Sequence, residues 1–141
     1  MRVFIAGIMQ ASLQGKGIVD QSYRNAIGEL LLARWPDLEV VDPIQLHPAS
    51  VEYGDELAKA TLFDLLDIAG GSDLVIAYVP QASMGTALEM HRAYNAGIPV
   101  ITISPMAENW VVRALSRRIF ADIPAFAAYV ADLDAPERLL R

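Results

Sequence analysis

A serine, a glycine and a glutamate follow a run of five apolar residues. Leu74 to Tyr78 is apolar without alternation, and Ser83, Gly85 and Glu89 come soon after it. A run of this length and pattern is typical of a strand that is covered on both faces. The sequence therefore predicts a buried strand, a loop with Ser83 and Gly85, and a helix with Glu89 in its first turn that stops near Gly97.

This placement gives Glu89 a possible chemical role. Ligands of open α/β sheets bind beyond the carboxyl ends of the strands, which is where the loop lies. A helix N-terminus favours the ionised form of a carboxyl group. An ionised carboxylate beside the space that a glycine leaves open is what a nucleophile on a sugar carbon needs. The alternative is that Glu89 only complements the helix dipole, and the spacing alone does not decide between the two.

The same stretch resembles the signature of the nucleoside 2-deoxyribosyltransferase family, which includes the 2′-deoxynucleoside 5′-monophosphate N-hydrolases. The matching residues are Ser83-x-Gly85-x-x-x-Glu89, preceded by Asp73-Leu-Val-Ile-Ala and followed by Ala93 and Gly97-Ile-Pro99-Val100. The resemblance extends from Val3 to about Asn109. It implies that Glu89 is the nucleophile that takes the sugar from the base, giving a glycosyl-Glu89 intermediate that meets another base or water.

The resemblance also implies a proton donor for the departing base. The family places an Asp on the helix that leads into the central strand, about eight residues before the first Asp of that strand. Asp64 lies nine residues before Asp73, and Asp67 lies six before it. Asp64 is therefore assigned as the acid, with Asp67 as the rival. Without the resemblance, such acids are typical of a solvated helix face.

Two positions near the N-terminus are assigned to the substrate. Gly7 ends the first apolar run and matches a family glycine that lets the backbone approach the sugar; the alternative is an ordinary turn. Shortly after it, the monophosphate hydrolases carry an Arg where this chain has Met9 and Gln10. Met9 is assigned as a substrate contact, together with Ser83 and Gly85. The missing guanidinium weakens the case for a 5′-phosphate, although Lys16 could substitute.

Asn109 is the last assigned substrate contact. Transferases of this family have an Asn here that a neighbouring subunit contributes to the 5′-hydroxyl of the sugar. The alternative is that Asn109 caps the helix that follows, a role that Asn fills well. The first reading predicts a homodimer or a higher homo-oligomer, and the apolar C-terminal third with Trp110 and Phe126 could supply the interface.

The chain departs from the family pattern at three further positions. Phe4 stands where family strands often carry Tyr, and Ala87 and His91 stand where many relatives have Gly. The added bulk at Ala87 and His91 either reshapes the base pocket or indicates lost activity. His47, in a loop with two prolines, is interpreted as surface or loop packing, with contact to a base as the alternative.

Strands and helices alternate along the chain, which predicts an α/β fold: a three-layer, flavodoxin-like, doubly wound parallel sheet in one domain of residues 1–141. The predicted strands are Val3–Ala6, Leu38–Val41, Leu74–Tyr78 and Val100–Ile103, with Arg118–Ala121 as the only candidate for a fifth. The predicted helices are Gln21–Arg34, Asp55–Ala69, the stretch after Ser83, about Val111–Phe120 and Pro124–Val130. Asp132 to Arg141 is predicted to be a frayed end.

Composition limits the partners. The net charge of −6 argues against a nucleic-acid partner, because phosphate backbones require a basic surface. The chain has no Cys and only two His, so no metal site and no cofactor are expected. The first apolar run is too short for a signal peptide and no run could cross a membrane, which predicts a cytoplasmic protein without a membrane partner.

Four functions compete at this stage. The first is cleavage of the N-glycosidic bond of a nucleoside or its 5′-monophosphate, a small-molecule substrate. The second rests on Gly85-Thr86-x-x-Glu89, which is similar to part of the motif of the cytokinin-activating phosphoribohydrolases, although their preceding Pro-Gly-Gly is absent. The third is a nucleotide-binding or sensing domain without catalysis. The fourth is a flavin-binding flavodoxin-like domain.

Overall fold

A computed structural model, which describes residues 1–141, contains one sheet of five parallel strands in the order β2-β1-β3-β4-β5. The strands are β1 Arg2–Gly7, β2 Glu39–Val41, β3 Leu74–Tyr78, β4 Val100–Ile103 and β5 Arg118–Phe120. This order is that of flavodoxin-like sheets, in which the chain winds outward in both directions from the centre. The predicted flavodoxin-like fold is confirmed, and so is the fifth strand.

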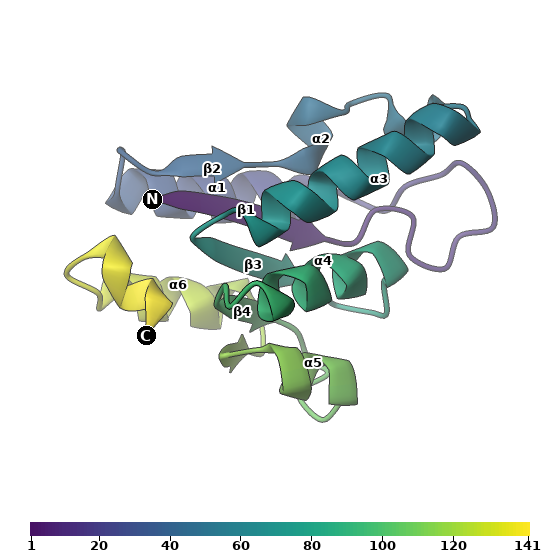
Figure 1. Ribbon diagram of the computed structural model, residues 1–141. Coiled ribbons are helices and arrows are strands. Elements are labelled where there is room, and N and C mark those ends of the chain that lie inside the picture. Colours follow the sequence, from purple (N-terminus) through teal and green to yellow (C-terminus); the bar gives the residue numbers. More distant parts are fainter.

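Helices cover both faces of the sheet and give three layers (Figure 1). The helices are α1 Ser22–Arg34, α2 Pro43–Leu46, α3 Asp55–Gly70, α4 Met84–Asn95, α5 Trp110–Leu115 and α6 Ile123–Ala131, with short 3₁₀ helices at Ser50–Glu52 and Pro136–Leu140. In Figure 1, α3, α4 and α5 lie in front of the sheet, while α1 and α6 lie behind it. None of the helices is both long and apolar enough to span a membrane.

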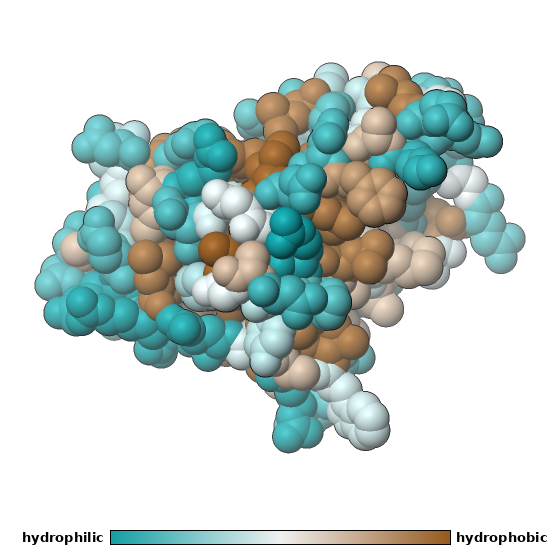
Figure 2. Space-filling model, viewed as in Figure 1, coloured by the Kyte–Doolittle hydropathy of each residue, from teal (hydrophilic) through white to brown (hydrophobic).

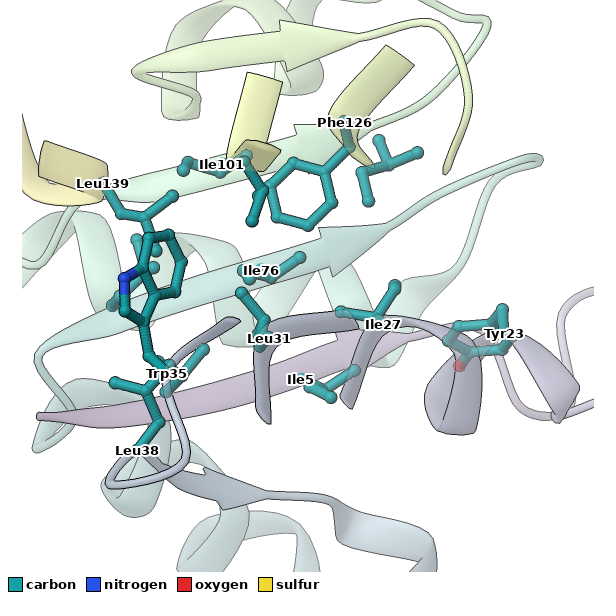
Figure 3. Packing of buried hydrophobic residues seen from close by; sticks show 14 of the residues in the cluster. Ile5, Tyr23, Ile27, Leu31, Trp35, Leu38, Ile76, Ile101, Phe126 and Leu139 are labelled. Carbon is teal, nitrogen blue, oxygen red and sulfur yellow. The ribbon is translucent and has the colours of Figure 1, made fainter. Parts of the chain in front are cut away.

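The core is divided in two by the sheet because side chains of a strand alternate between its faces. From β1, Val3 and Ile5 point into the core formed with α1 and α6, whereas Phe4 and Ala6 point into the core formed with α3 and α4. All four are fully buried. Figure 3 shows the first of these cores, in which aromatic and aliphatic side chains of α1 and α6 pack onto the strands.

Three C-terminal expectations were wrong in detail. The helix predicted over Val111–Phe120 ends at Leu115, because the chain turns there and re-enters the sheet as β5. The predicted frayed end instead forms the 3₁₀ helix, and its Leu139 is fully buried (Figure 3). Phe126 is also fully buried in the core of its own chain, which removes it from any interface with another subunit.

Candidate active site

A cavity of about 350 Å³ opens at the carboxyl ends of β1 and β3, between α3 and α4. Its wall combines residues of the loop after β1, the connection before α3, one face of α3, and the N-terminal half of α4. The lining residues are Gly7, Met9, Gln10, Ala11, Leu13, Ser50, Val51, Tyr53, Ala58, Thr61, Leu62, Leu65, Ser83, Met84, Gly85, Thr86 and Glu89. Figure 2 shows apolar surface gathered between α3 and α4.

Glu89 is the only charged residue of this wall, and its side chain is 8% exposed. Its carboxyl group accepts no hydrogen bond from the protein, yet it has surface open to the cavity. Ser83 is the N-cap of α4, so Glu89 is the sixth helical residue and lies in the second turn. The prediction of the first turn was wrong by one turn, and the influence of the helix terminus on Glu89 is correspondingly smaller.

Burial raises the pKa of Glu89 to about 8, against the opposing effect of the Arg24 charge. The carboxyl group of the unliganded protein is therefore mainly protonated at neutral pH. The expectation of an ionised group was wrong for this state, because removal of water from a carboxylate outweighs a distant cation. A carboxyl group with a pKa close to neutrality is a frequent feature of catalytic sites.

Ser83 and Thr86 shape the start of α4. The Ser83 Oγ accepts a hydrogen bond from the Thr86 backbone N–H at 3.4 Å and lies 2.9 Å from the Thr86 Oγ1. This cap explains why the helix begins directly after the loop. A Cβ at Gly85 would meet nothing within 4 Å, so this glycine leaves open space on the cavity side.

Gly7 lies in the cavity wall, but its missing side chain makes room for the Tyr23 ring on the opposite face of the sheet. A Cβ at Gly7 would lie 2.6 Å from Cε2 of Tyr23, a distance that real contacts do not show. The Tyr23 hydroxyl donates a hydrogen bond to the carbonyl of Ile8 at 2.9 Å, which holds the chain directly after the strand. Met9 follows in the cavity wall, as the assignment to the substrate requires.

Arg24 lies beneath this end of β1 and is 3% exposed. Its guanidinium group donates hydrogen bonds to the carbonyls of Ile5 at 2.9 Å and Gly7 at 3.0 Å, and to the Asp42 carboxylate at 3.2 Å. The Arg24 Nε donates to the Gln21 side chain at 2.8 Å. A buried cation that donates these four hydrogen bonds fixes the strand end that forms the floor of the cavity.

The structure does not bring Asp64 to Glu89. Asp64 is exposed and is not among the lining residues; α3 instead turns Thr61 and Leu65 into the cavity. Successive helical residues differ by about 100°, so Asp64 points away where Leu65 points in. The rival Asp67 is also outside the cavity and pairs with Arg92 at 3.3 Å on the surface.

Asn109 lies at a second, mainly apolar cavity of about 420 Å³ between α4 and α5, which shares Ser83 with the first. The Asn109 Oδ1 accepts hydrogen bonds from the backbone N–H groups of Val111 at 2.9 Å and Val112 at 3.3 Å. Asn109 thus caps α5, as its alternative reading proposed. Its amide group makes no hydrogen bond within the chain.

Met9 and Gln10, which stand where the hydrolases carry an Arg, line the cavity of Glu89, but the three further departures from the family pattern do not. Phe4 is fully buried in the core, Ala87 faces the second cavity, and His91 is exposed beside Asn95. The expectation that His91 adds bulk near the site is therefore not met. No three His, Asp or Glu side chains are grouped as they would be around a metal ion.

Sequence reasoning missed four polar residues of the wall: Ser50, Tyr53, Thr61 and Thr86. Thr86 carried a signal, because it stands three residues after a Ser that could cap a helix. Thr61 and Tyr53 carried none. Their positions depend on the direction of α3 and on the path of the chain from β2, which local sequence patterns do not specify.

Solved structures share this fold over nearly the whole chain. A 2-deoxyribosyltransferase from Bacillus psychrosaccharolyticus matches with a TM-score of 0.72 at 19% identity, over 99% of this chain and 96% of that one. The chain has the 2-deoxyribosyltransferase fold. A CMP N-glycosidase from Clostridium botulinum matches with a TM-score of 0.57 at 19% identity, over 93% of this chain and 98% of that one.

The 2-deoxyribosyltransferase fold also occurs in a conserved protein from Enterococcus faecalis V583, with a TM-score of 0.61 at 19% identity over 93% of this chain and 97% of that one. No protein-family profile and no curated protein sequence matches the chain. At these identities the likeness establishes the fold, and the chemistry has to be argued from the cavity itself.

Proposed function

We propose that this protein cleaves the N-glycosidic bond of nucleosides, with Glu89 as the nucleophile. The observation that carries the proposal is a buried carboxyl group with no hydrogen bond from the protein, open to a cavity at the ligand-binding edge of the sheet. The structural neighbours that are named as a 2-deoxyribosyltransferase and a CMP N-glycosidase support the same chemistry.

The proposed reaction has two steps. The Glu89 carboxylate attacks C1′, the bond from C1′ to the base nitrogen breaks, and its electron pair leaves with the base. The resulting glycosyl ester of Glu89 is then opened by a second base, giving transfer, or by water, giving hydrolysis. This is the division used by retaining glycosidases. Binding of an electron-poor sugar carbon beside Glu89 favours the ionised form that the empty cavity disfavours.

The charge of the cavity favours nucleosides over their 5′-monophosphates. No Lys, Arg or His lines the wall, and its only charged residue is an acid. Lys16, the substitute cation considered from the sequence, pairs with Glu52 at 3.1 Å in a surface contact between two exposed side chains. A phosphate group without a cationic partner would lose its hydration and meet the field of Glu89. The same argument disfavours a phosphoribohydrolase.

Replacement of Glu89 tests the nucleophile. Glu89→Gln and Glu89→Ala should reduce base release from a panel of deoxynucleosides and ribonucleosides by on the order of 10³-fold or more. Glu29→Gln, an exposed acid on α1, is the control and should retain full activity. Rapid quenching and mass spectrometry should find the sugar on the peptide that contains Glu89. Full activity of Glu89→Gln would overturn the proposal.

A charge exchange in the loop after β1 tests the preference for nucleosides. The wild type should have a kcat/KM at least about tenfold higher for a nucleoside than for its monophosphate, the cost of one unfavourable charge contact. Gln10→Arg should raise the relative kcat/KM of the monophosphate, and Gln10→Glu, the matched variant, should lower it. A wild-type preference for the monophosphate would contradict this part of the proposal.

One observation favours a second function, binding without turnover. The face of α3 that meets the cavity carries Ala58, Thr61, Leu62 and Leu65, so no acid from this helix stands beside Glu89. If nucleosides bind with micromolar affinity in calorimetry and no member of the panel is cleaved, this second function replaces the first.

A further inference from the structure

The cavity wall contains one ionisable residue besides Glu89, which is Tyr53. Tyr53 follows the 3₁₀ helix Ser50–Glu52 and stands two residues before α3 begins. Its side chain is half-buried, and its backbone N–H donates to the carbonyl of Ser50 at 3.2 Å. The residue is thus held at a defined point of the wall that faces α4.

Tyr53 has a hydrogen-bonding partner outside the cavity. The Tyr53 hydroxyl lies 3.2 Å from Nδ1 of His47, and the two rings meet edge to face with centroids 5.9 Å apart. His47 ends α2, where its backbone N–H donates to the carbonyl of Pro43 at 2.9 Å. His47 is half-buried and does not line the cavity, so it can exchange protons with solvent.

Departure of a base requires a proton that the rest of the wall does not supply. The base leaves with the electron pair of the broken C1′–N bond, and a natural base is a poor anion. Asp64 and Asp67 lie outside the cavity, and the remaining polar side chains of the wall are amides and aliphatic hydroxyls. Neither of these loses a proton near neutral pH.

We propose that Tyr53 is the catalytic residue that protonates the departing base and that His47 is the positioning residue that supports it. This inference rests on the proposed function. With Nδ1–H of His47 donating to the phenol oxygen, the hydrogen of Tyr53 is free to point to the base. Few side chains other than His, Asp or Glu serve as general acids, and Tyr is one of them.

The proton balance closes within one turnover. The Tyr53 proton goes to the base nitrogen as the C1′–N bond breaks and the C1′–O bond to Glu89 forms. The phenolate then takes a proton from solvent through the ring of His47. When water or an acceptor base opens the ester, the proton that it releases returns to solvent. Glu89 leaves as a carboxylate, ready for the next substrate.

The test compares two leaving groups. Tyr53→Phe keeps the ring and removes the proton, so kcat for a nucleoside should fall about 100-fold, within the usual range for loss of a general acid. With a nitrophenyl 2-deoxyriboside, whose nitrophenolate leaves without protonation, the same variant should retain nearly the wild-type kcat. Tyr94→Phe, an exposed tyrosine of α4 outside this cavity, is the matched control and should act as wild type on both.

A second variant tests the role of His47. His47→Phe keeps an aromatic edge and removes the hydrogen bond, and we expect a fall in kcat of about tenfold for the nucleoside with little change in KM. Because His47 acts through Tyr53, the double variant should be no slower than Tyr53→Phe alone, which is the non-additivity of coupled residues. Additive losses would overturn the assignment of His47.

The outcomes separate this inference from the proposed function. Equal nucleoside rates for Tyr53→Phe and the wild type, or equal losses on both leaving groups, would overturn the role of Tyr53 and leave the role of Glu89 intact. A wild type that releases neither bases nor nitrophenolate overturns the proposed function, and the present inference with it.

Discussion

Arg24 and Glu89 are both charged residues inside the protein, and their surroundings differ completely. Arg24 is 3% exposed and donates hydrogen bonds to two strand carbonyls, to Asp42 and to Gln21. Glu89 is 8% exposed and receives no hydrogen bond from the protein. Arg24 lies on α1 and Glu89 on α4, two helices that cover opposite faces of the sheet.

We interpret the difference as one between a structural charge and the carboxyl group that is proposed to react. A buried charge with its hydrogen bonds satisfied holds elements together, and its loss leaves partners unpaired. A buried carboxyl group without partners costs stability, and proteins keep such groups where function requires them. Arg24 holds the strand end that forms the cavity floor, whereas Glu89 lines the cavity itself. Four experiments can break or sharpen this contrast.

The largest expected effect is on the structural charge. Arg24→Met should lower the free energy of unfolding by about 3–5 kcal/mol, because it leaves Asp42 and two strand carbonyls buried without their partner. Denaturant titration measures this loss. Arg138→Met, which breaks an exposed pair with Asp134, is the control and should cost under about 1 kcal/mol. Equal small losses would show that Arg24 is not the support described here.

The second effect is on catalysis and pH. The pKa of Glu89 is about 8 in the free protein, so its ionised fraction falls about tenfold for each pH unit below that value. We expect kcat/KM for a nucleoside to rise from pH 6 to a plateau above pH 8, a change of about 100-fold. A pH profile that is flat over this range would exclude ionised Glu89 of the free protein as the reacting group.

The third effect is on the stability of the wild type relative to Glu89→Gln. The pKa of Glu89 is raised from 4.5 to about 8 on folding, so the folded protein keeps a proton that the unfolded chain releases between these values. The free energy of unfolding therefore falls as pH rises from about 4.5 to 8. Glu89→Gln should lack this fall and be more stable by about 1–2 kcal/mol at pH 8.

Thermal unfolding at pH 5 and pH 8 measures this difference, which should be small at pH 5 and level off above pH 8. If Glu89→Gln is less stable than the wild type at pH 8, Glu89 has partners that the structure does not show. Glu29→Gln again serves as the control, because Glu29 is exposed on α1.

The smallest effect concerns Asn109, whose hydrogen bonding lies between that of Arg24 and that of Glu89. Its Oδ1 accepts two hydrogen bonds, whereas its NH₂ group makes none within the chain. Asn109→Ala should cost about 1 kcal/mol through loss of the α5 cap. Asn109→Asp keeps the cap and removes the amide donor. A fall in activity for Asn109→Asp without loss of stability would support the predicted contact with substrate; unchanged activity would leave Asn109 a cap only.

The oligomeric state stays a prediction, and Asn109 could reach a neighbouring site only through it. Beside Asn109, Trp110 is 84% exposed and Met84, at the start of α4, is 83% exposed. Light scattering of the wild type and of Trp110→Ser would show whether this surface joins subunits.

The sequence predicted what depends on local patterns. The apolar runs predicted four strands. The short fifth strand was recognised only as a candidate, because Arg118–Phe120 contains only two consecutive apolar residues. Ser83, Gly85 and Glu89 were found together because one loop and one helix hold all three. Their shared cavity follows from the parallel sheet, whose strand ends meet at one edge.

The features that could not be predicted from the sequence depend on contacts between elements that are distant in the chain. Asp64 was chosen by its spacing to β3, but one residue of helical phase decides which side chain lines the cavity, and the spacing does not fix that phase. The protonation of Glu89 depends on burial by α3 and by the loop after β1. The partnership of Arg24 with Asp42 joins residues on different elements, with no motif to indicate it.

The first turns of α3 stand clear of the sheet, as Figure 1 shows, and residues 55–60 are all exposed. Almost nothing of the core depends on them, whereas Ala58 forms part of the cavity wall. Substitutions in these first turns should therefore change the shape of the cavity with little effect on the core. Positions in these turns are therefore the ones where selectivity could be altered, by evolution or by design, with the least loss of stability.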